Sequence, residues 1–312
     1  MEYTTKLTLI GLYFSLTILE YVHGEIVGAF VLPHGGIALD PRNFNTTNKT
    51  EIQQANKLHE ACLKVGHDIR SLNPEVIFLS TPHGIADYKN FLMYSNSVGS
   101  GFGDVDDCLQ KPCQYNLTIN LDSNIAERFF AAQGYSNNVS LLSAFGPEGS
   151  NNSVPLRWGE VIPLLLVNMT ATVKVVILSQ PTRRYTETLD MTTELTNLGR
   201  HLGMFLHGLT ERVAVVISAD LAHTHKADGP YGYSNASEPF DKLMGDWAST
   251  MSSVFIDMAA QYVDRALSCG YTGLKMLDGM FTLGTPRLRP LLYANLHPSY
   301  YGMMAASFLP DV

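Results

Sequence analysis

The chain has 312 residues, of which 46% are hydrophobic and 16% are charged. This composition excludes an intrinsically disordered chain and is sufficient for a large buried core. Acidic residues outnumber basic ones by 29 to 21, the formal net charge is −8, and the sequence has no run of lysine or arginine. Nucleic acid is therefore not an expected partner.

Residues 1–24 have the pattern of a secretory signal peptide. Lys6 precedes a mostly apolar run over residues 7–19, and Gly24 supplies the small residue before a cleavage site. The run is short for a bilayer span, which takes about 20 apolar residues. We predict a secreted domain of residues 25–312, and an uncleaved N-terminal anchor is the alternative.

The acceptor motif for N-glycosylation occurs more often than composition predicts. Chance gives about two or three N-x-[ST] motifs without proline in such a chain, and the excess indicates a glycosylated secretory protein. The predicted glycosylation sites are Asn45, Asn48, Asn116, Asn138, Asn151, Asn168 and Asn235.

The chain has four cysteines, Cys62, Cys108, Cys113 and Cys269. Cys108 and Cys113 flank "LQKP" in a polar loop, and this spacing predicts a short-loop disulfide in an oxidising compartment. Cys62 lies in a predicted helix. Cys269 can pair with Cys62, remain a free thiol or bind a metal, and the sequence leaves these alternatives open.

In chain order, short apolar runs alternate with longer helical segments. Runs rich in Val, Ile and Leu predict strands covered on both faces over 25–33, 75–82, 139–144, 173–179 and 212–220. Apolar residues at helical spacing predict helices within 51–72, 123–133 and 186–209. This alternation predicts an α/β fold, a three-layer α/β/α domain with a central, largely parallel (mixed) sheet. Polar segments 84–116 and 224–242 read as long loops, which commonly carry a site.

Histidines and an aspartate follow three of the predicted strands. His34 lies in "LPHGG", His83 in "STPHG", and Asp220 and His223 in "SADLAH". The carboxyl ends of parallel strands meet at one edge of a sheet, where ligands bind. The glycine after each of the first two histidines allows a sharp turn or close approach to a ligand. We therefore expect these side chains to share one site.

Two neutral imidazoles from adjacent strands suit a divalent transition metal such as Fe, Cu, Zn or Ni. A third ligand is expected within residues 262–281, where the candidates are Asp264, Cys269 and Asp278. Aromatic residues at 158 and 300–301 fit either the wall of a pocket or core packing.

Taken together and in order, "LPHGG", "STPHG", "ISADLAH", "DGPYGY", "EPFDK" and "ALSCGY" resemble the LigB-like family of class III extradiol ring-cleavage dioxygenases, which also includes the Memo proteins. The similarity extends from Glu25 to about Phe308. It implies that His34 and His83 bind Fe(II) and that His223 acts as acid and base. The family's third ligand, a glutamate, falls at Cys269 here, where the Memo branch has Cys-Gly.

We therefore expect a secreted Fe(II) dioxygenase that uses O₂ to open the ring of a small catechol-like substrate. Its metal ligands are His34, His83 and Cys269, and His223 is the catalytic acid and base. Asp220 would either orient His223 or serve as an N-cap or strand-end acceptor. The expected partners are this aromatic substrate and O₂, with a homo-oligomer or a separate partner protein as further alternatives.

Two other hypotheses remain open. The chain could be a Memo-like protein that binds copper or another metal, such as iron or zinc, through His34, His83 and Cys269 and acts by redox chemistry or through a partner protein, without ring cleavage. It could also be an interaction domain with a Cys62–Cys269 disulfide. His225 is expected in a loop or beside the site, and His297 either beside the site or in packing.

Overall fold

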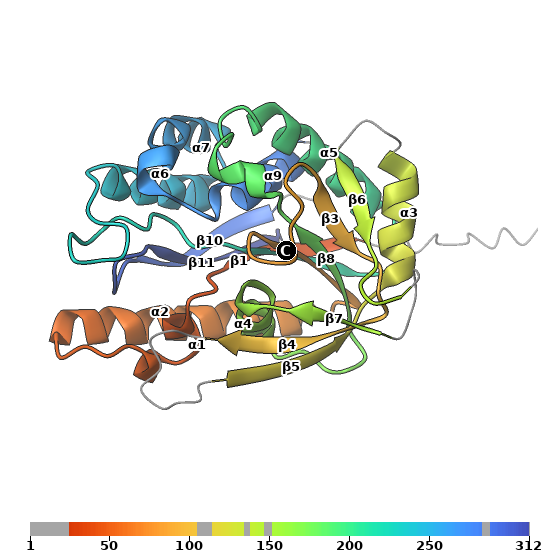
Figure 1. Ribbon diagram of the computed structural model, residues 1–312, viewed down its shortest axis with the longest axis horizontal. Coiled ribbons are helices and arrows are strands. Elements are labelled where there is room, and N and C mark those ends of the chain that lie inside the picture. Colours follow the sequence, from red (N-terminus) through yellow and green to blue (C-terminus); the bar gives the residue numbers. More distant parts are fainter. Residues whose placement is uncertain (1–24, 105–113, 134–137, 147–151, 283–287, 312) are drawn as a thin grey trace, which may run out of the picture.

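The computed structural model describes residues 25–104, 114–133, 138–146, 152–282 and 288–311. A mixed eight-stranded sheet lies between two layers of helices (Figure 1), with the strand order β10-β11-β1-β9-β2-β8-β3-β6. The α/β fold expected from the alternation of strands and helices is confirmed.

The middle of the sheet is parallel. Four adjacent strands run in the same direction: β1 (Ile26–Leu32), β9 (Val213–Ser218), β2 (Val76–Thr81) and β8 (Lys174–Ser179). Each coincides with a predicted run, and nearly every residue in them is buried. Their common direction brings four carboxyl ends to one edge of the sheet.

The edges of the sheet contain the antiparallel pairs. Strand β11 (Met303–Pro310) is antiparallel to β1 and to β10 (Leu288–Leu296). On the other side, β3 (Phe91–Tyr94) is antiparallel to β8 and parallel to β6 (Val139–Leu142). The sheet is therefore mixed, with a parallel centre.

A second, three-stranded sheet was not expected from the sequence. It consists of β4 (Val98–Asp104), β5 (Gln114–Asn120) and β7 (Ser153–Leu156) in the order β5-β4-β7. The prediction of a loop over 84–116 was wrong, because this segment contains β3, β4 and the start of β5. The sequence of β4, VGSGFGD, reads as a loop because glycine weakens isolated strands, but β4 here pairs with both of its neighbours.

Helices cover both faces of the main sheet (Figure 1). One layer contains α2 (Lys49–Ser71) and α4 (Trp158–Val167). The opposite layer contains α5 (Thr192–His207), α6 (Ser237–Thr250), α7 (Ser253–Ala259) and α9 (Tyr271–Phe281). The other helices are α1 (Gly36–Leu39), α3 (Ser123–Gln133) and α8 (Val263–Ala266), with short 3₁₀ turns η1 (Pro41–Asn43), η2 (Thr182–Tyr185) and η3 (Ala260–Tyr262).

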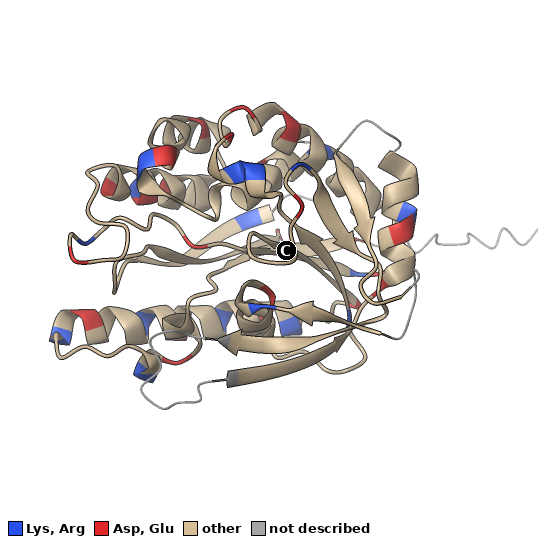
Figure 2. Cartoon of the chain, viewed as in Figure 1, with Lys and Arg blue, Asp and Glu red and all other residues tan. Residues whose placement is uncertain are grey.

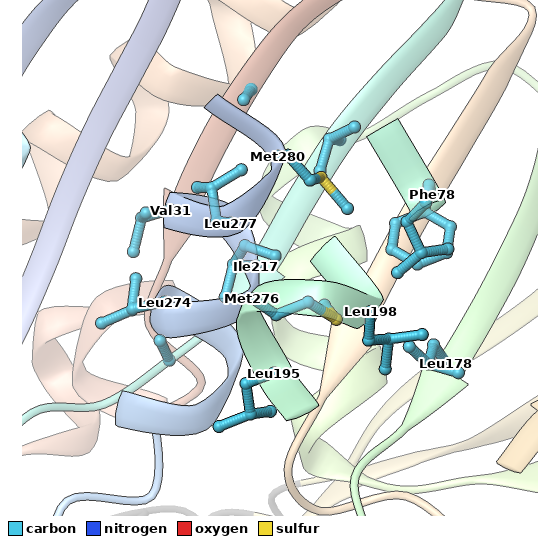
Figure 3. Close-up of a cluster of buried hydrophobic side chains, with 14 of the residues drawn as sticks. Val31, Phe78, Leu178, Leu195, Leu198, Ile217, Leu274, Met276, Leu277 and Met280 are labelled. Atoms are coloured by element: carbon cyan, nitrogen blue, oxygen red, sulfur yellow. The ribbon is translucent and has the colours of Figure 1, made fainter. Parts of the chain in front are cut away.

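Each face of the sheet has its own hydrophobic core. Figure 3 shows part of the core that α5 and α9 form with the sheet, including Leu198, Ile217 and Met276. Lysine, arginine and acidic residues lie mostly on helices and connections, and the central strands carry few of them (Figure 2). The strands are thus fixed by apolar contacts on both faces, each fully buried large side chain contributing about 1.5–3 kcal/mol.

Some of the predictions concern the surface or the termini. Residues 1–24, with the predicted signal peptide, lie outside the described residues, as do Cys108, Cys113 and Asn151. Asn138 is half-buried, and the other predicted glycosylation sites, Asn45, Asn48, Asn116, Asn168 and Asn235, are exposed. Within the part of the chain that the structure describes, no helix has the length and apolar character needed to cross a bilayer.

Candidate metal centre and its cavity

His34 follows β1 and is held by a defined hydrogen-bond chain. Its Nδ1 lies 2.9 Å from the Oγ of Ser218, the last residue of β9, and the Ser218 hydroxyl donates to the carbonyl oxygen of Gly159 at 2.6 Å. Because a carbonyl only accepts, the Ser218 proton is already used, so its Oγ accepts from Nδ1–H of His34. A neutral His34 therefore presents its lone pair at Nε2, where it can bind a metal.

Two further atoms that could bind a metal lie close to His34 Nε2. Cys269 Sγ lies 3.3 Å from His34 Nε2, and Asp220 Oδ2 lies 3.2 Å from the same nitrogen. Asp220 also accepts the backbone N–H of His34 through Oδ1 at 3.1 Å. Three groups thus meet at one point. The imidazole of His34 comes from the end of β1, the carboxylate of Asp220 from the end of β9, and the thiol of Cys269 from the residues just before α9.

His83 follows β2 and completes the group. Its ring packs edge-on against the His34 ring, with 4.8 Å between centroids, and lies 5.1 Å from the ring of Trp158. One donor atom from each of His34, His83 and Cys269 lies within 4.8 Å of the other two. The expected convergence of the two histidines is therefore present, and Cys269 lies at the third corner.

His223 lies beside this group. Its Nδ1–H donates to the carbonyl oxygen of Leu267 at 2.9 Å, so the neutral ring keeps its lone pair at Nε2. The ring stacks on Tyr301, with centroids 5.7 Å apart and planes 10° apart. Potential ligand atoms of Asp220, His223 and Cys269 also lie within 4.8 Å of one another, so His223 adjoins the candidate metal ligands.

Burial governs the protonation of the site. Burial, followed by the neighbouring His83, lowers the pKa of His34 well below its ordinary value. Burial lowers the pKa of His83 to about 3 and that of His223 to about 4. All three imidazoles are therefore neutral at pH 7, which is the form that binds metals and accepts protons.

The two acidic groups shift in the opposite direction for the same reason. Burial raises the pKa of Asp220 to about 7 and that of the Cys269 thiol to about 12. Without a metal the thiol carries its proton, and a bound cation must displace that proton to gain a thiolate ligand.

A cavity of about 190 Å³ opens over these groups. Its walls come from the loops after β2, β8 and β9 and from the segment around α8, and are formed by His83, Arg184, Tyr185, Thr188, His223, Tyr231, Val263, Asp264, Leu267, Ser268 and Cys269. Ligand pockets commonly measure about 300–1,000 Å³, so this cavity fits a small substrate.

Arg184 is a cavity residue that the sequence reasoning missed. It lies in η2 after β8, is only 5% exposed, and donates through Nη2 to the carbonyl oxygen of Pro82 and to the hydroxyl of Tyr185. The strand-end rule that identified His34 and His83 also applies to the predicted strand 173–179. Applied to this strand, the rule would have indicated the residues that follow it, including Arg184.

The alternative third ligands lie elsewhere. Asp278 is buried in α9, where it accepts from Trp247 Nε1 at 3.0 Å and pairs with Lys275 at 3.0 Å. Asp264 is exposed at the rim of the cavity. Of the three candidates, Cys269 has its donor atom beside both histidines.

The structure changes the expected role of Asp220. We expected its carboxylate to orient His223, but its hydrogen bonds go to His34. The ring of His223 is oriented instead by the Leu267 carbonyl and by Tyr301.

His225 and His297 lie behind the site and stack face to face, with centroids 4.0 Å apart and planes 2° apart. His225 Nε2 lies 2.7 Å from Asp241 Oδ2, and Asp241 Oδ1 accepts the N–H of Ala222 at 2.9 Å. A donor atom of Glu238 lies near both rings. The lone pairs of an imidazole lie in the plane of its ring, so two rings stacked face to face do not direct their lone pairs at one ion. The pair instead helps to hold Asp241, which binds the backbone N–H of Ala222 after β9.

The glycines of the two Pro-His-Gly sequences have a packing role. A Cβ on Gly35 would overlap the hydroxyl of Tyr301, and a Cβ on Gly84 would lie 2.5 Å from the hydroxyl of Tyr94. We expected these glycines to allow a sharp turn or close approach to a ligand. In the structure these glycines make room for tyrosine side chains that pack around the site.

Cys62 is a buried free thiol, as is Cys269. The disulfide required by the interaction-domain hypothesis is therefore not formed in this structure.

Comparison with known proteins identifies relatives but no activity. No family model matches the chain. It is 26% identical over 283 residues to Protein CA_C1420 of Clostridium acetobutylicum, an alignment that covers 89% of this chain and 56% of the relative. The chain thus spans little more than half the length of that protein. The structure of uncharacterized protein JW3007 from Escherichia coli K12 matches with a TM-score of 0.53 and 16% identity over 90% of this chain and 99% of that one, a likeness that shows the fold alone.

Proposed function

We propose that this protein is a metal-dependent oxidoreductase that uses O₂ to open the ring of a catechol-type substrate. The observation that carries the proposal is the convergence of His34, His83 and Cys269 beneath a small cavity that also exposes His223. The resemblance of the strand-end motifs to extradiol dioxygenases supports the same assignment.

The donor set fits a divalent transition metal. Two neutral imidazoles and a thiol, with the carboxylate of Asp220 3.2 Å from His34 Nε2, are ligands that iron, copper and zinc accept. We propose Fe(II), held by His34, His83 and Cys269. When bound, it would bring substrate and O₂ together and pass electrons from the ring to oxygen.

His223 would move the protons. The Leu267 carbonyl binds Nδ1–H and thereby keeps the lone pair at Nε2, where it can accept the proton of a phenolic hydroxyl group. Burial lowers the pKa of His223 to about 4, so the neutral ring is a weak base, and a bound metal would have to lower the pKa of the phenolic hydroxyl group for this proton transfer. The protonated ring would then return its proton readily. One side chain thus supplies both base and acid.

A second candidate function follows from Cys269. Its thiol lies 3.3 Å from His34 Nε2, and the resemblance to ring-cleaving enzymes implies a glutamate at this position. Thiolates favour Cu(I) and Zn(II) over the harder ferrous ion. This observation favours a Memo-like copper-binding protein that acts in redox chemistry or through a partner protein, without ring cleavage.

Oxygen uptake by the protein, loaded anaerobically with Fe(II) and given a panel of catechols, tests the proposal. We expect uptake with formation of a coloured ring-opened product. His83→Ala should abolish both uptake and iron binding, whereas His67→Ala on the exposed face of α2 should leave both unchanged. Absence of uptake at full iron occupancy would reject ring cleavage and favour the copper-binding function.

A further inference from the structure

Phe102 is a large apolar side chain on the outer face of the second sheet. It lies in β4 and is 52% exposed. The side chains around it on this face of β4 and β5 are polar, namely Ser100, Asn116 and Thr118. An exposed ring gains nothing from the removal of apolar surface from water, so its place among polar side chains calls for a group that would cover it.

The inner face of β4 has no room for this ring. A Cβ on Gly101 would overlap the backbone of Leu156 in β7, and a Cβ on Gly103 would lie 3.2 Å from the side chain of Val161 in α4. Successive side chains of a strand point to opposite faces, so a register that turns these glycines inward turns Phe102 outward. The exposure of Phe102 is therefore a fixed property of the strand.

Asn116 lies directly across the strand pair from Phe102. Residues directly opposite each other in an antiparallel pair share a face, and their Cβ atoms lie about 4.5–5.5 Å apart. Thr118 completes the N-x-[ST] motif two residues further along β5 and is exposed on the same face. A predicted attachment point for a glycan and the exposed ring are thus neighbours.

The amide of Asn116 is available for modification, in contrast to another predicted site. Asn138 donates through Nδ2 to Glu194 Oε1 at 2.8 Å, so the fold already uses the nitrogen that a glycan would take. Among the described residues, none forms a hydrogen bond with the Asn116 side chain. Attachment of a sugar at Asn116 therefore breaks no contact of the described fold.

We propose that the first N-acetylglucosamine of a glycan on Asn116 packs on the ring of Phe102. This inference rests on the predicted glycosylation of Asn116 and is independent of the proposed function. In the secretory pathway the oligosaccharide passes from a lipid diphosphate donor to Nδ2, which loses one proton as the lipid diphosphate leaves. One face of the attached sugar carries only C–H groups, and such groups bind the electron-rich face of an aromatic ring.

The packed sugar would strengthen a sheet that has little support on its outer side. β4 and β5 lie outside the helix layer that contains α2 and α4 (Figure 1), and within the described residues β5 pairs with β4 alone. A sugar attached to β5 that rests on a ring of β4 links the two strands beyond their backbone hydrogen bonds. It also covers the apolar surface that the register forces outward.

Nuclear magnetic resonance tests this contact on the native protein, produced in a secretory host with an isotope-labelled glycan. We expect nuclear Overhauser effects between the Phe102 ring and the first sugar on Asn116, and upfield ring-current shifts of that sugar's C–H protons. Phe102→Thr should return these shifts to ordinary values and leave the signals of a glycan on Asn48 unchanged. An unmodified Asn116, or a sugar without these effects, would overturn the proposal.

Thermal unfolding measures the contribution of the contact. Loss of the glycan in Asn116→Gln should lower the Tm by about 1–3 °C, as expected for loss of one good cross-strand contact. Enzymatic trimming to the first sugar should leave the Tm unchanged. In a Phe102→Thr background, Asn116→Gln should have no such effect, whereas a Phe130→Ala background, which lacks an exposed ring of α3, should retain it. Equal effects in all backgrounds would reject the pairing of sugar and ring.

Sedimentation distinguishes the sugar from another occupant of the ring. The glycosylated protein and the Phe102→Thr variant should have the same oligomeric state. A dimer that Phe102→Thr dissociates would show instead that a second copy of the chain covers Phe102. Neither result bears on oxygen uptake, so the proposed function can fail while this inference stands, and the reverse.

Discussion

His34 Nε2 lies 3.3 Å from Cys269 Sγ and 3.2 Å from Asp220 Oδ2. One imidazole nitrogen thus faces a soft sulfur donor and a hard oxygen donor at nearly equal distances. Because metals differ in their preference for these two donors, the residue that binds decides which chemistry the site supports.

Replacement of Cys269 by serine should weaken metal binding by about tenfold or more. The physical reason is loss of a thiolate ligand. The Co(II)-loaded protein should show a thiolate-to-metal charge-transfer band that Cys269→Ser lacks. Cys62→Ser, which alters the other buried thiol, is the matched control and should keep the band. A band that persists in Cys269→Ser would mean that this residue is not a ligand.

His223→Gln should separate metal binding from turnover. Its side chain is placed beside the ligands but outside the group formed by His34, His83 and Cys269, so metal content should remain near that of the native protein. Turnover should fall by about 10²–10⁴-fold, the usual contribution of a general acid–base group. Metal analysis and oxygen uptake on the same sample check both parts. Unchanged turnover would remove His223 from the mechanism.

Glu160 should make stability depend on pH. Burial raises its pKa from 4.5 to about 7, so the folded state favours the protonated carboxyl group. This contribution to the free energy of unfolding is complete below the unfolded-state pKa and is lost as the pH rises through the folded-state pKa. The free energy of unfolding should change by about 3 kcal/mol, because the side chain is fully buried.

Glu160→Gln removes this titration. The free energy of unfolding of the variant, relative to that of the native protein, should therefore increase as the pH rises from about 5 to about 8. Urea unfolding of the metal-free protein measures the difference. Glu60→Gln, on the exposed side of α2, should show no such gain. A constant difference between Glu160→Gln and the native protein across this range would show that Glu160 titrates normally.

Gly35→Ala should destabilise the protein by about 1–3 kcal/mol, because the added methyl group overlaps the Tyr301 ring. The cost should fall sharply in a Tyr301→Ala background, where the overlap is absent. A double-mutant cycle by urea unfolding measures this coupling. Additive effects would indicate that the glycine is required for another reason.

Glycosylation should be visible when the chain is produced through a secretory pathway. Asn48 is exposed and caps α2 through Oδ1, which accepts the N–H of Thr50 at 3.0 Å. A glycan attached to its Nδ2 leaves this cap intact, so occupancy should not reduce stability. Mass analysis before and after enzymatic removal of N-glycans checks occupancy, and an unmodified chain would contradict the predicted glycosylation.

The central strands and the convergence of His34 and His83 were predictable because each depends on a local pattern. Runs such as VAVVIS in β9 are apolar on both faces, which indicates a buried strand without further information. The strand-end rule then places the next polar residues at one edge. His34 and His83 meet in the structure for this reason.

Other features depend on contacts that no local pattern records. Strand β4 forms because β5 and β7 pair with it, although its glycines resemble a loop. The sequence also does not distinguish Arg183 from Arg184, since their difference arises from the acidic residues that approach only one of them. Likewise, the partner of Asp220 follows from the neighbouring strand β1, which lies far earlier in the chain.

The pair His34 and Cys269 is separated by 235 residues in the chain. A site with such long-range contacts forms late in folding, because the entropy of closing a large loop must be overcome first. During synthesis the N-terminal histidines would emerge from the ribosome well before the thiol. A metal that binds at this site would therefore enter a nearly complete fold rather than nucleate it, and its supply would affect the folding yield little.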